Sequence, residues 1–95
     1  MNKTLSLLGI CRKAGKLSVG HDMVFQSVRK GKAKLVVLTK DASPRHSREL
    51  EAAEFAGSVI TLEATADIVG PAIGKRCCIF AVEDDGFAKA IEKTV

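Results

Sequence analysis

The 95-residue sequence contains no tryptophan and no tyrosine, and phenylalanine occurs only four times. Proteins that hold single-stranded nucleic acid on an exposed aromatic platform, as RRM and OB folds do, need several such rings for base stacking. That mode of binding is therefore disfavoured. The sequence also lacks an apolar run near the roughly 20 residues that a membrane-spanning helix needs, and its N-terminal segment has no small-residue cleavage site. We expect a cytoplasmic protein that does not contact membranes.

Cysteine is scarce, with Cys11, Cys77 and Cys78 as the three examples. An odd number of cysteines argues against a disulfide framework. The adjacent pair lacks CxxC spacing, and no second ligand pair lies at the spacing of a zinc site. We expect these thiols to be buried, unreactive packing residues, with a redox-active Cys77–Cys78 pair as the alternative.

Recognisable catalytic motifs are also lacking. The two histidines, His21 and His46, lie in neither a GxSxG nor an HExxH motif. Residues 70–75, GPAIGK, have the wrong spacing for a phosphate-binding Walker loop and follow a helical pattern. Residues 83–86, EDDG, offer carboxylates for magnesium but fit the start of a capped helix better. We therefore expect no enzymatic activity, no cofactor and no metal site.

Acidic residues are nearly absent from the first half of the chain. Residues 1–48 contain eleven lysines and arginines but only Asp22 and Asp41, a balance of +9. Residues 49–95 carry a balance of −5, and the whole chain has a net charge of +4. This asymmetry indicates that one part of the surface faces a polyanion. The simpler interpretation is that the charges only solvate exposed helix faces.

Helical and strand-like segments alternate along the whole chain. The expected helices cover residues 2–14, 21–30, 44–56, 66–73 and 87–93, and the expected strands cover residues 17–19, 33–39, 58–62 and 77–82. This alternation predicts an α/β fold, a three-layer α/β/α sandwich with a roughly four-stranded mixed sheet. The chain length predicts a single domain over residues 1–95.

Local signals mark several of these elements. The continuous apolar run at residues 35–38, LVVL, is typical of a central strand that is covered on both faces. Ser43 followed by Pro44 is a favourable helix start, with the serine as N-cap. Gly57 and Gly74 are expected to end the third and fourth helices.

The stretch from Leu17 to Lys34 is the part of the sequence most suggestive of function. A short apolar run stops at Gly20, and a helical pattern follows as far as Gly31. A helix start offers unpaired backbone N–H groups and a partial positive charge, which suit a phosphate or the polar edge of a base. We hypothesise that this helix start and the lysines flanking it bind RNA. The basic residues lie mostly in or beside loops that can meet at one end of the sheet: Lys13, Lys16, Lys30, Lys32, Lys34, Lys40, Arg45 and Arg48.

Four segments, CRKAGKLSVGHDMV, VRKGKAKLVVLTKDASP, IVGPAIGK and DDGFAKAI, carry a resemblance that spans essentially the whole chain. In this order and spacing they resemble the kink-turn-binding ribosomal-protein family of the L-seven-Ae/L-thirty-e type, and most of all its small bacterial YlxQ-like members. The resemblance implies an α/β/α sandwich, RNA as the partner and no catalysis. It also implies recognition of the sharp bend of a kink-turn, in ribosomal RNA or a similar structured RNA.

Two surfaces of this family bind the bend. At the start of the second helix, a Gly-x-Asn-Glu-x-x-Lys pattern faces tandem G·A pairs; here the corresponding residues are Gly20, Asp22, Met23 and Gln26, of which only the glycine matches. Asp22 can still accept hydrogen bonds from base amino groups. The second surface of the family is the loop between the fourth helix and the last strand. In this chain, residues 74–76 resemble that loop. The residues that the resemblance and the helix-start hypothesis together assign to RNA are Lys13, Lys16, Gly20, His21, Asp22, Met23, Gln26, Lys30, Lys32, Lys34, Gly74, Lys75 and Arg76.

Each assignment has a simpler structural alternative. Gly20 can be a tight turn only, and Asp22 a charge that favours a helix N-terminus. Met23 can be a packing residue, and His21 an exposed residue without a role. Because Asp22, Met23 and Gln26 depart from the family pattern, the alternative function is a protein-interaction adaptor that has kept the fold and lost specific RNA recognition. We expect a monomer.

Overall fold

The computed structural model describes residues 2–95 and contains the expected alternation of elements. In chain order these are α1 (Asn2–Lys13), β1 (Leu17–Val19), α2 (His21–Arg29), β2 (Leu35–Leu38), α3 (Pro44–Ala52), β3 (Ser58–Thr61), α4 (Ala66–Ile73), β4 (Ile79–Val82) and α5 (Asp85–Glu92). Among these residues, no helix combines the length and apolar character required to cross a bilayer.

The four strands form one mixed sheet in the order β1-β4-β2-β3. The last strand of the chain, β4, lies between β1 and β2 and runs antiparallel to both, whereas β2 and β3 are parallel. Val19 pairs with Phe80, and Leu38 pairs with Ile79. The C-terminal ends of β1 and β2 therefore lie beside the N-terminal end of β4, at one edge of the sheet.

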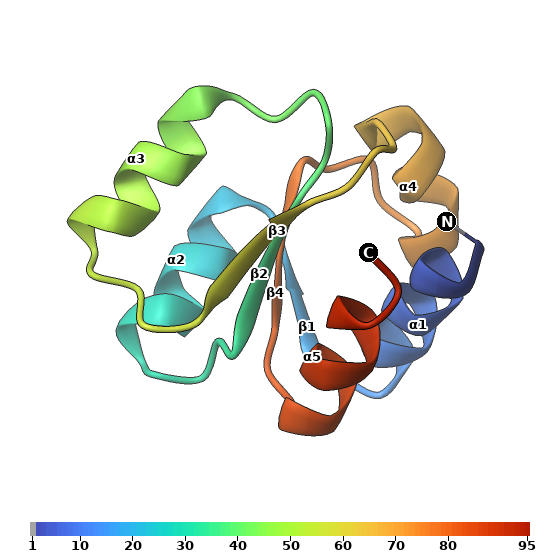
Figure 1. Ribbon diagram of the computed structural model, residues 1–95, viewed down its shortest axis with the longest axis horizontal. Helices are drawn as coiled ribbons and strands as arrows, with labels where there is room; N and C mark the ends of the chain where they lie inside the picture. Colours follow the sequence, from blue (N-terminus) through green and yellow to red (C-terminus); the bar gives the residue numbers. More distant parts are fainter. Residues whose placement is uncertain (1) are drawn as a thin grey trace.

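Helices cover both faces of this sheet, which confirms the predicted three-layer sandwich. Helices α2 and α3 lie on one side, and α1, α4 and α5 lie on the other (Figure 1). Side chains alternate between the two cores along each buried strand, as the period of two requires. In β2, Val36 belongs to the core that contains Val24 of α2, while Val37 belongs to the core that contains Leu8 of α1. All four residues of β2 are buried, as the LVVL run predicts.

The end of α3 differs from the prediction. The helix stops at Ala52, and Glu54 adopts a left-handed conformation with φ of 56°. Phe55 then donates its N–H to the carbonyl of Leu50, 3.2 Å away. Gly57 is not the helix cap, and its role is steric: a Cβ there would lie 2.6 Å from the Lys34 carbonyl oxygen. The other expected signals hold, since Ser43 caps α3 with Pro44 in its first turn, and Gly74 ends α4.

The cysteines are only partly as predicted. Cys11 is buried, but Cys77 and Cys78 are half-buried, so the expectation of burial is wrong for this pair. The reason is that β4 begins at Ile79, two residues later than the apolar run suggests. The pair therefore lies in the loop that leads into β4.

Candidate nucleic-acid interface

Three loops meet at the edge of the sheet where β1 and β2 end and β4 begins. The N–H of Gly20 donates to the carbonyl of Ile79 over 3.1 Å, and the N–H of Thr39 donates to the carbonyl of Cys78 over 3.0 Å. We call this the Gly20 edge; it comprises residues 20–22, 39–43 and 74–78. It brings together the start of α2 and the loop before β4, the two segments that the family resemblance assigns to RNA.

The backbone at Gly20 explains why a glycine begins α2. Its φ of 97° and ψ of 157° lie in a region that residues with a Cβ rarely enter. The bend lets the chain leave the edge strand β1 and start a helix at the next residue. Gly20 has no side chain with which to cap the first turn of α2, so the N–H groups there are not capped by the N-cap residue, and Asp22 is the acidic residue of this turn that interacts with the helix dipole.

An exposed stripe of side chains runs along α2 from this start. Met23, Gln26 and Lys30 are exposed and follow one another at spacings of three and four residues, which places them on one side of the helix. With Lys32 and Glu83, they line a shallow hollow next to β1. The alternative that Met23 is a packing residue is wrong, because it is 54% exposed.

Five lysines assigned to RNA lie away from the Gly20 edge. Lys34 donates its N–H to the carbonyl of Val82, and Lys16 accepts from Glu83, both at the end of β4 that is remote from Ile79. The five, which we call the distal lysines, are Lys13, Lys16, Lys30, Lys32 and Lys34. They are exposed, but the expectation that they flank the start of α2 is wrong. The Gly20 edge and the distal lysines lie at opposite ends of β4, and α2 spans about 13 Å between these ends.

The distal lysines do not form one patch either. Lys30 and Lys32 share the hollow beside α2, whereas Lys13 lines a different hollow with residues of α1 and α4, on the opposite face of the sheet. Lys30 and Lys32 are therefore continuous with the α2 stripe, and Lys13 is not.

The cations at the Gly20 edge come from other loops. Lys40, Lys75 and Arg76 are all exposed there. Arg76 donates from Nε to Asp67 of α4, an interaction that raises the pKa of its guanidinium. Among the described residues, Lys75 has no carboxylate within ion-pair distance. Lys75 is therefore the more available charge of the loop.

The half-buried carboxylate of Glu83, at the start of the EDDG segment, ties α2 to the sheet. Oε2 of Glu83 accepts hydrogen bonds from Ser18 of β1 at 2.8 Å and from Ser27 of α2 at 2.6 Å. Burial raises the pKa of Glu83, but the two hydroxyls and the nearby Lys32 and Lys16 outweigh burial and hold it below its ordinary value. Nothing in the sequence indicated that Ser18, Ser27 and Glu83, which are far apart in the chain, would meet.

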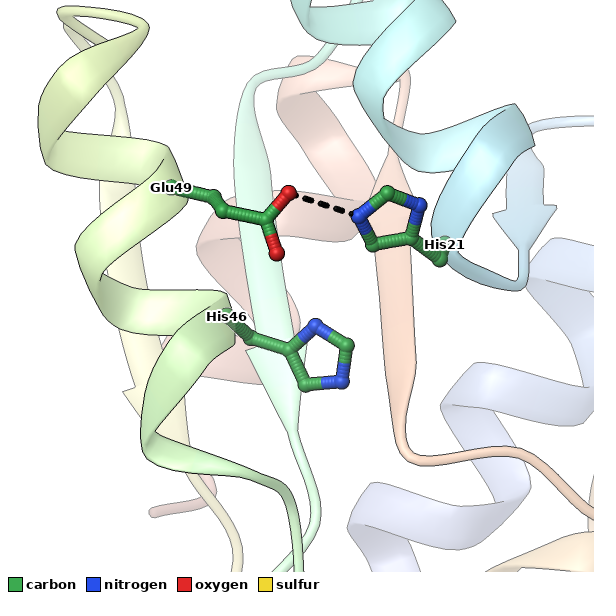
Figure 2. A group of neighbouring side chains, drawn as sticks. All are labelled: His21, His46 and Glu49. Atoms are coloured by element: carbon green, nitrogen blue, oxygen red, sulfur yellow. Dashed lines mark hydrogen bonds and ion pairs between the residues drawn. The ribbon is translucent and has the colours of Figure 1, made fainter.

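His21 has a structural partner, so the alternative that it is exposed without a role is wrong. Its Nε2 lies 2.8 Å from Oε2 of Glu49, and its Nδ1 lies 3.1 Å from Oδ1 of Asp22. These two hydrogen bonds raise the pKa of His21 above its ordinary value. Figure 2 shows His21 reaching from α2 toward Glu49 and His46 of α3. The only available sequence signal was the spacing of His46 and Glu49, three residues apart on one helix.

Comparison with protein families places these features in context. The model of the "Ribosomal protein L7Ae/L30e/S12e/Gadd45 family" matches residues 2–92. The RNA-binding protein YlxQ of Bacillus subtilis is 34% identical over 88 residues, which cover 90% of this chain and 87% of that protein. The large ribosomal subunit protein eL30 of Spodoptera frugiperda is 33% identical over 92 residues, covering 85% of this chain and 75% of that one.

Two solved structures share this fold. A Bacillus halodurans protein of unknown function superposes with a TM-score of 0.87 at 29% identity, covering 98% of this chain and 96% of the other. A Giardia lamblia 15.5 kD RNA-binding protein has a TM-score of 0.77 at 17% identity, covering 97% of this chain and 81% of the other, which supports the fold. The chain belongs to the ribosomal protein L7Ae/L30e/S12e/Gadd45 family.

Proposed function

We propose that this protein is a non-enzymatic, cytoplasmic RNA-binding protein that acts as a monomer in or on the ribosome and recognises kink-turn-like structured RNA. Residues 1–95 form its single RNA-binding domain. The observation that carries the proposal is the hydrogen bond between Gly20 and Ile79, which joins the start of α2 to the loop before β4. The names of the YlxQ and eL30 relatives support RNA as the partner.

At the Gly20 edge, the first turn of α2 and the loop of residues 74–78 contact the bend of the RNA. The uncapped helix start favours phosphate oxygens or base acceptors. Asp22, which is fully exposed, accepts hydrogen bonds from base amino groups. Lys75 binds a phosphate through charge and helps to fix the register of the RNA.

The α2 stripe continues the contact away from the bend. A helical arm of the RNA that leaves the Gly20 edge along Met23 and Gln26 reaches Lys30 and Lys32. These two lysines neutralise backbone phosphates without reading sequence. This arrangement assigns recognition of the bend to the Gly20 edge and non-specific affinity to the far end of α2. Lys13, on the other face of the sheet, contributes little.

The proposal is tested by titrating the protein with a kink-turn RNA and with an uninterrupted duplex of the same length, each at several salt concentrations. We expect tighter binding to the kink-turn, and we expect Lys75→Ala to reduce that preference. Lys89→Ala is the matched control, because Lys89 is an exposed lysine on α5, on the other face of the sheet. Equal affinity for both RNAs would contradict recognition of the bend. If the protein still captures partner proteins after ribonuclease treatment, the result would favour the adaptor alternative.

A further inference from the structure

The side chains of His21, His46 and Glu49 converge between α2 and α3. One ligand atom from each, a ring nitrogen or a carboxylate oxygen, lies within 4.8 Å of the other two. Figure 2 shows the Nδ1 side of the His46 ring facing the Glu49 carboxylate and the His21 ring. The centroids of the two imidazole rings are 5.8 Å apart. Three potential ligands from two elements thus face one small space.

The polar atoms of this cluster are not all satisfied. His46 is only 9% exposed, and its Nδ1 has no hydrogen-bond partner among the described residues. Glu49 Oε1 also makes no hydrogen bond, although Arg45 Nε lies 3.1 Å away as an ion-pair partner. A buried polar atom without a partner is costly and rare in folded proteins. A ligand in the space between these atoms would satisfy both.

We propose that His21 Nε2, His46 Nδ1 and a carboxylate oxygen of Glu49 bind a divalent transition-metal ion, with zinc as the best fit. Two imidazoles and one carboxylate form a ligand set that zinc accepts, with water as the fourth ligand of a tetrahedral site. Zinc–ligand bonds of about 2.0–2.1 Å place tetrahedral ligand atoms about 3.3 Å apart. The cluster contracts by about 1–1.5 Å at its widest to reach that geometry.

The surroundings of His21 match those of a metal ligand. Its other ring nitrogen, Nδ1, lies 3.1 Å from Oδ1 of Asp22. Metal-bound histidines commonly donate the second N–H to a carboxylate, which fixes the tautomer and directs the free nitrogen at the metal. Asp22 therefore has a positioning role. The ion crosslinks the first residue of α2 to α3, directly beside Gly20.

The test uses cobalt(II) as a spectroscopic probe, together with zinc competition against a chromophoric chelator. Both are carried out on the free protein in a Cys77→Ser, Cys78→Ser background, which removes these two half-buried cysteines as competing ligands. We expect one equivalent of cobalt to give the intense visible bands of a tetrahedral site and zinc to abolish them. Zinc is also expected to raise the melting temperature, since it binds only the folded chain.

Variants distinguish this site from adventitious binding. Glu49→Gln and His46→Ala should each lose the cobalt bands and weaken zinc binding more than Asp22→Asn, for which about a 10-fold loss is expected. Glu51→Gln is the matched control, since Glu51 is an exposed glutamate on the same helix. Unfolding of each variant without metal checks that it folds.

The proposal is overturned if the background protein gives no tetrahedral cobalt spectrum, or if Glu49→Gln binds zinc as tightly as Glu51→Gln. His21 and Glu49 would then form only an ion pair between the two helices. Because no RNA is present in these measurements, their outcome is independent of the RNA-binding proposal.

Discussion

The hydroxyl of Ser27, on the inner side of α2, donates a hydrogen bond of 2.6 Å to the carboxylate of Glu83. Glu83 follows directly after β4, and the same oxygen accepts from Ser18 of the neighbouring strand β1. One carboxylate thus connects an edge strand, a central strand and the helix that carries the proposed RNA contacts. Its contribution can be measured through stability.

Replacing Ser27 by alanine should lower the free energy of unfolding at neutral pH by about 1.5–3 kcal/mol, the range for a hydrogen bond to a charged group. Chemical denaturation provides the measurement. Ser6→Ala is the control, because Ser6 is an exposed serine on α1. A loss no larger than that of the control would mean that Ser18 and the two lysines hold Glu83 without Ser27.

The hydrogen bond between Ser27 and Glu83 also predicts that the stability of the protein depends on pH. The pKa of Glu83 is lower in the folded protein than its ordinary value of 4.5. The ionised carboxylate therefore stabilises the fold above pH 4.5, and this contribution is lost as the pH falls through the lower, folded-state pKa. Denaturation curves of the natural protein and Glu83→Gln should differ most near neutral pH and converge in acid. A constant difference across this range would contradict the prediction.

Close packing between α1 and α4 gives a second prediction about stability. A Cβ added at Gly9 would lie 2.8 Å from the backbone carbonyl oxygen of Ala72. Backbone cannot move aside as a flexible side chain can, so Gly9→Ala should destabilise the protein by about 1–3 kcal/mol. Helix propensity alone predicts the opposite sign, a gain of about 1 kcal/mol. Thermal unfolding decides between them, and Lys3→Ala, an exposed change on the same helix, controls for altered propensity.

Local sequence patterns predicted the elements well because the physics of each element is local. The apolar run of β2 and the Ser43–Pro44 start of α3 depend only on neighbouring residues, and both are present. The end of α3 was missed because Glu54 takes a left-handed conformation that normally favours glycine or asparagine.

The arrangement of the site depended on facts that no local pattern contains. The insertion of β4 between β1 and β2 puts the distal lysines and the Gly20 edge at opposite ends of one strand. In the same way, the Asp41 carboxylate accepts the N–H of Ala66, 25 residues away, at the start of α4. Such contacts between distant residues depend on the order of the strands in the sheet. The alternation of helices and strands along the sequence does not determine that order. Only the family resemblance predicted that the start of α2 and residues 74–76 would lie close together.

Lys30 and Lys32, the distal lysines beside the α2 stripe, should contribute charge without selectivity. Lys30→Ala and Lys32→Ala are each expected to reduce the steepness of the dependence of log affinity on log salt by about 0.7–0.9, the amount for one phosphate contact. The reduction should be the same for a kink-turn RNA and for a plain duplex. Lys13→Ala should leave the slope unchanged, because Lys13 lies on the other face of the sheet. A change in the ratio of the two affinities would show instead that Lys30 or Lys32 contacts the bend.

The exposed stripe of α2 provides the sharpest test of RNA recognition. By the family resemblance, Met23 and Gln26 correspond to the glutamate and lysine of the family pattern, and both are exposed. The double variant Met23→Glu, Gln26→Lys should leave the free energy of unfolding within about 0.5 kcal/mol. It should also tighten binding to a kink-turn RNA by about 10-fold or more, since each added base contact is worth about 1–3 kcal/mol. Calorimetric titration of both proteins gives the comparison.

A matched control separates recognition from charge. Ile10→Glu with Ser6→Lys adds the same two charges to exposed positions of α1, on the other face of the sheet, and should not change the affinity. If the α2 double variant gains no more than this control, the exposed stripe of α2 does not hold RNA in the family manner. If it gains strongly, the natural methionine and glutamine weaken binding to a standard kink-turn. The natural surface is then either degenerate, as the adaptor alternative expects, or directed at an RNA that differs from that motif at the positions that Met23 and Gln26 face.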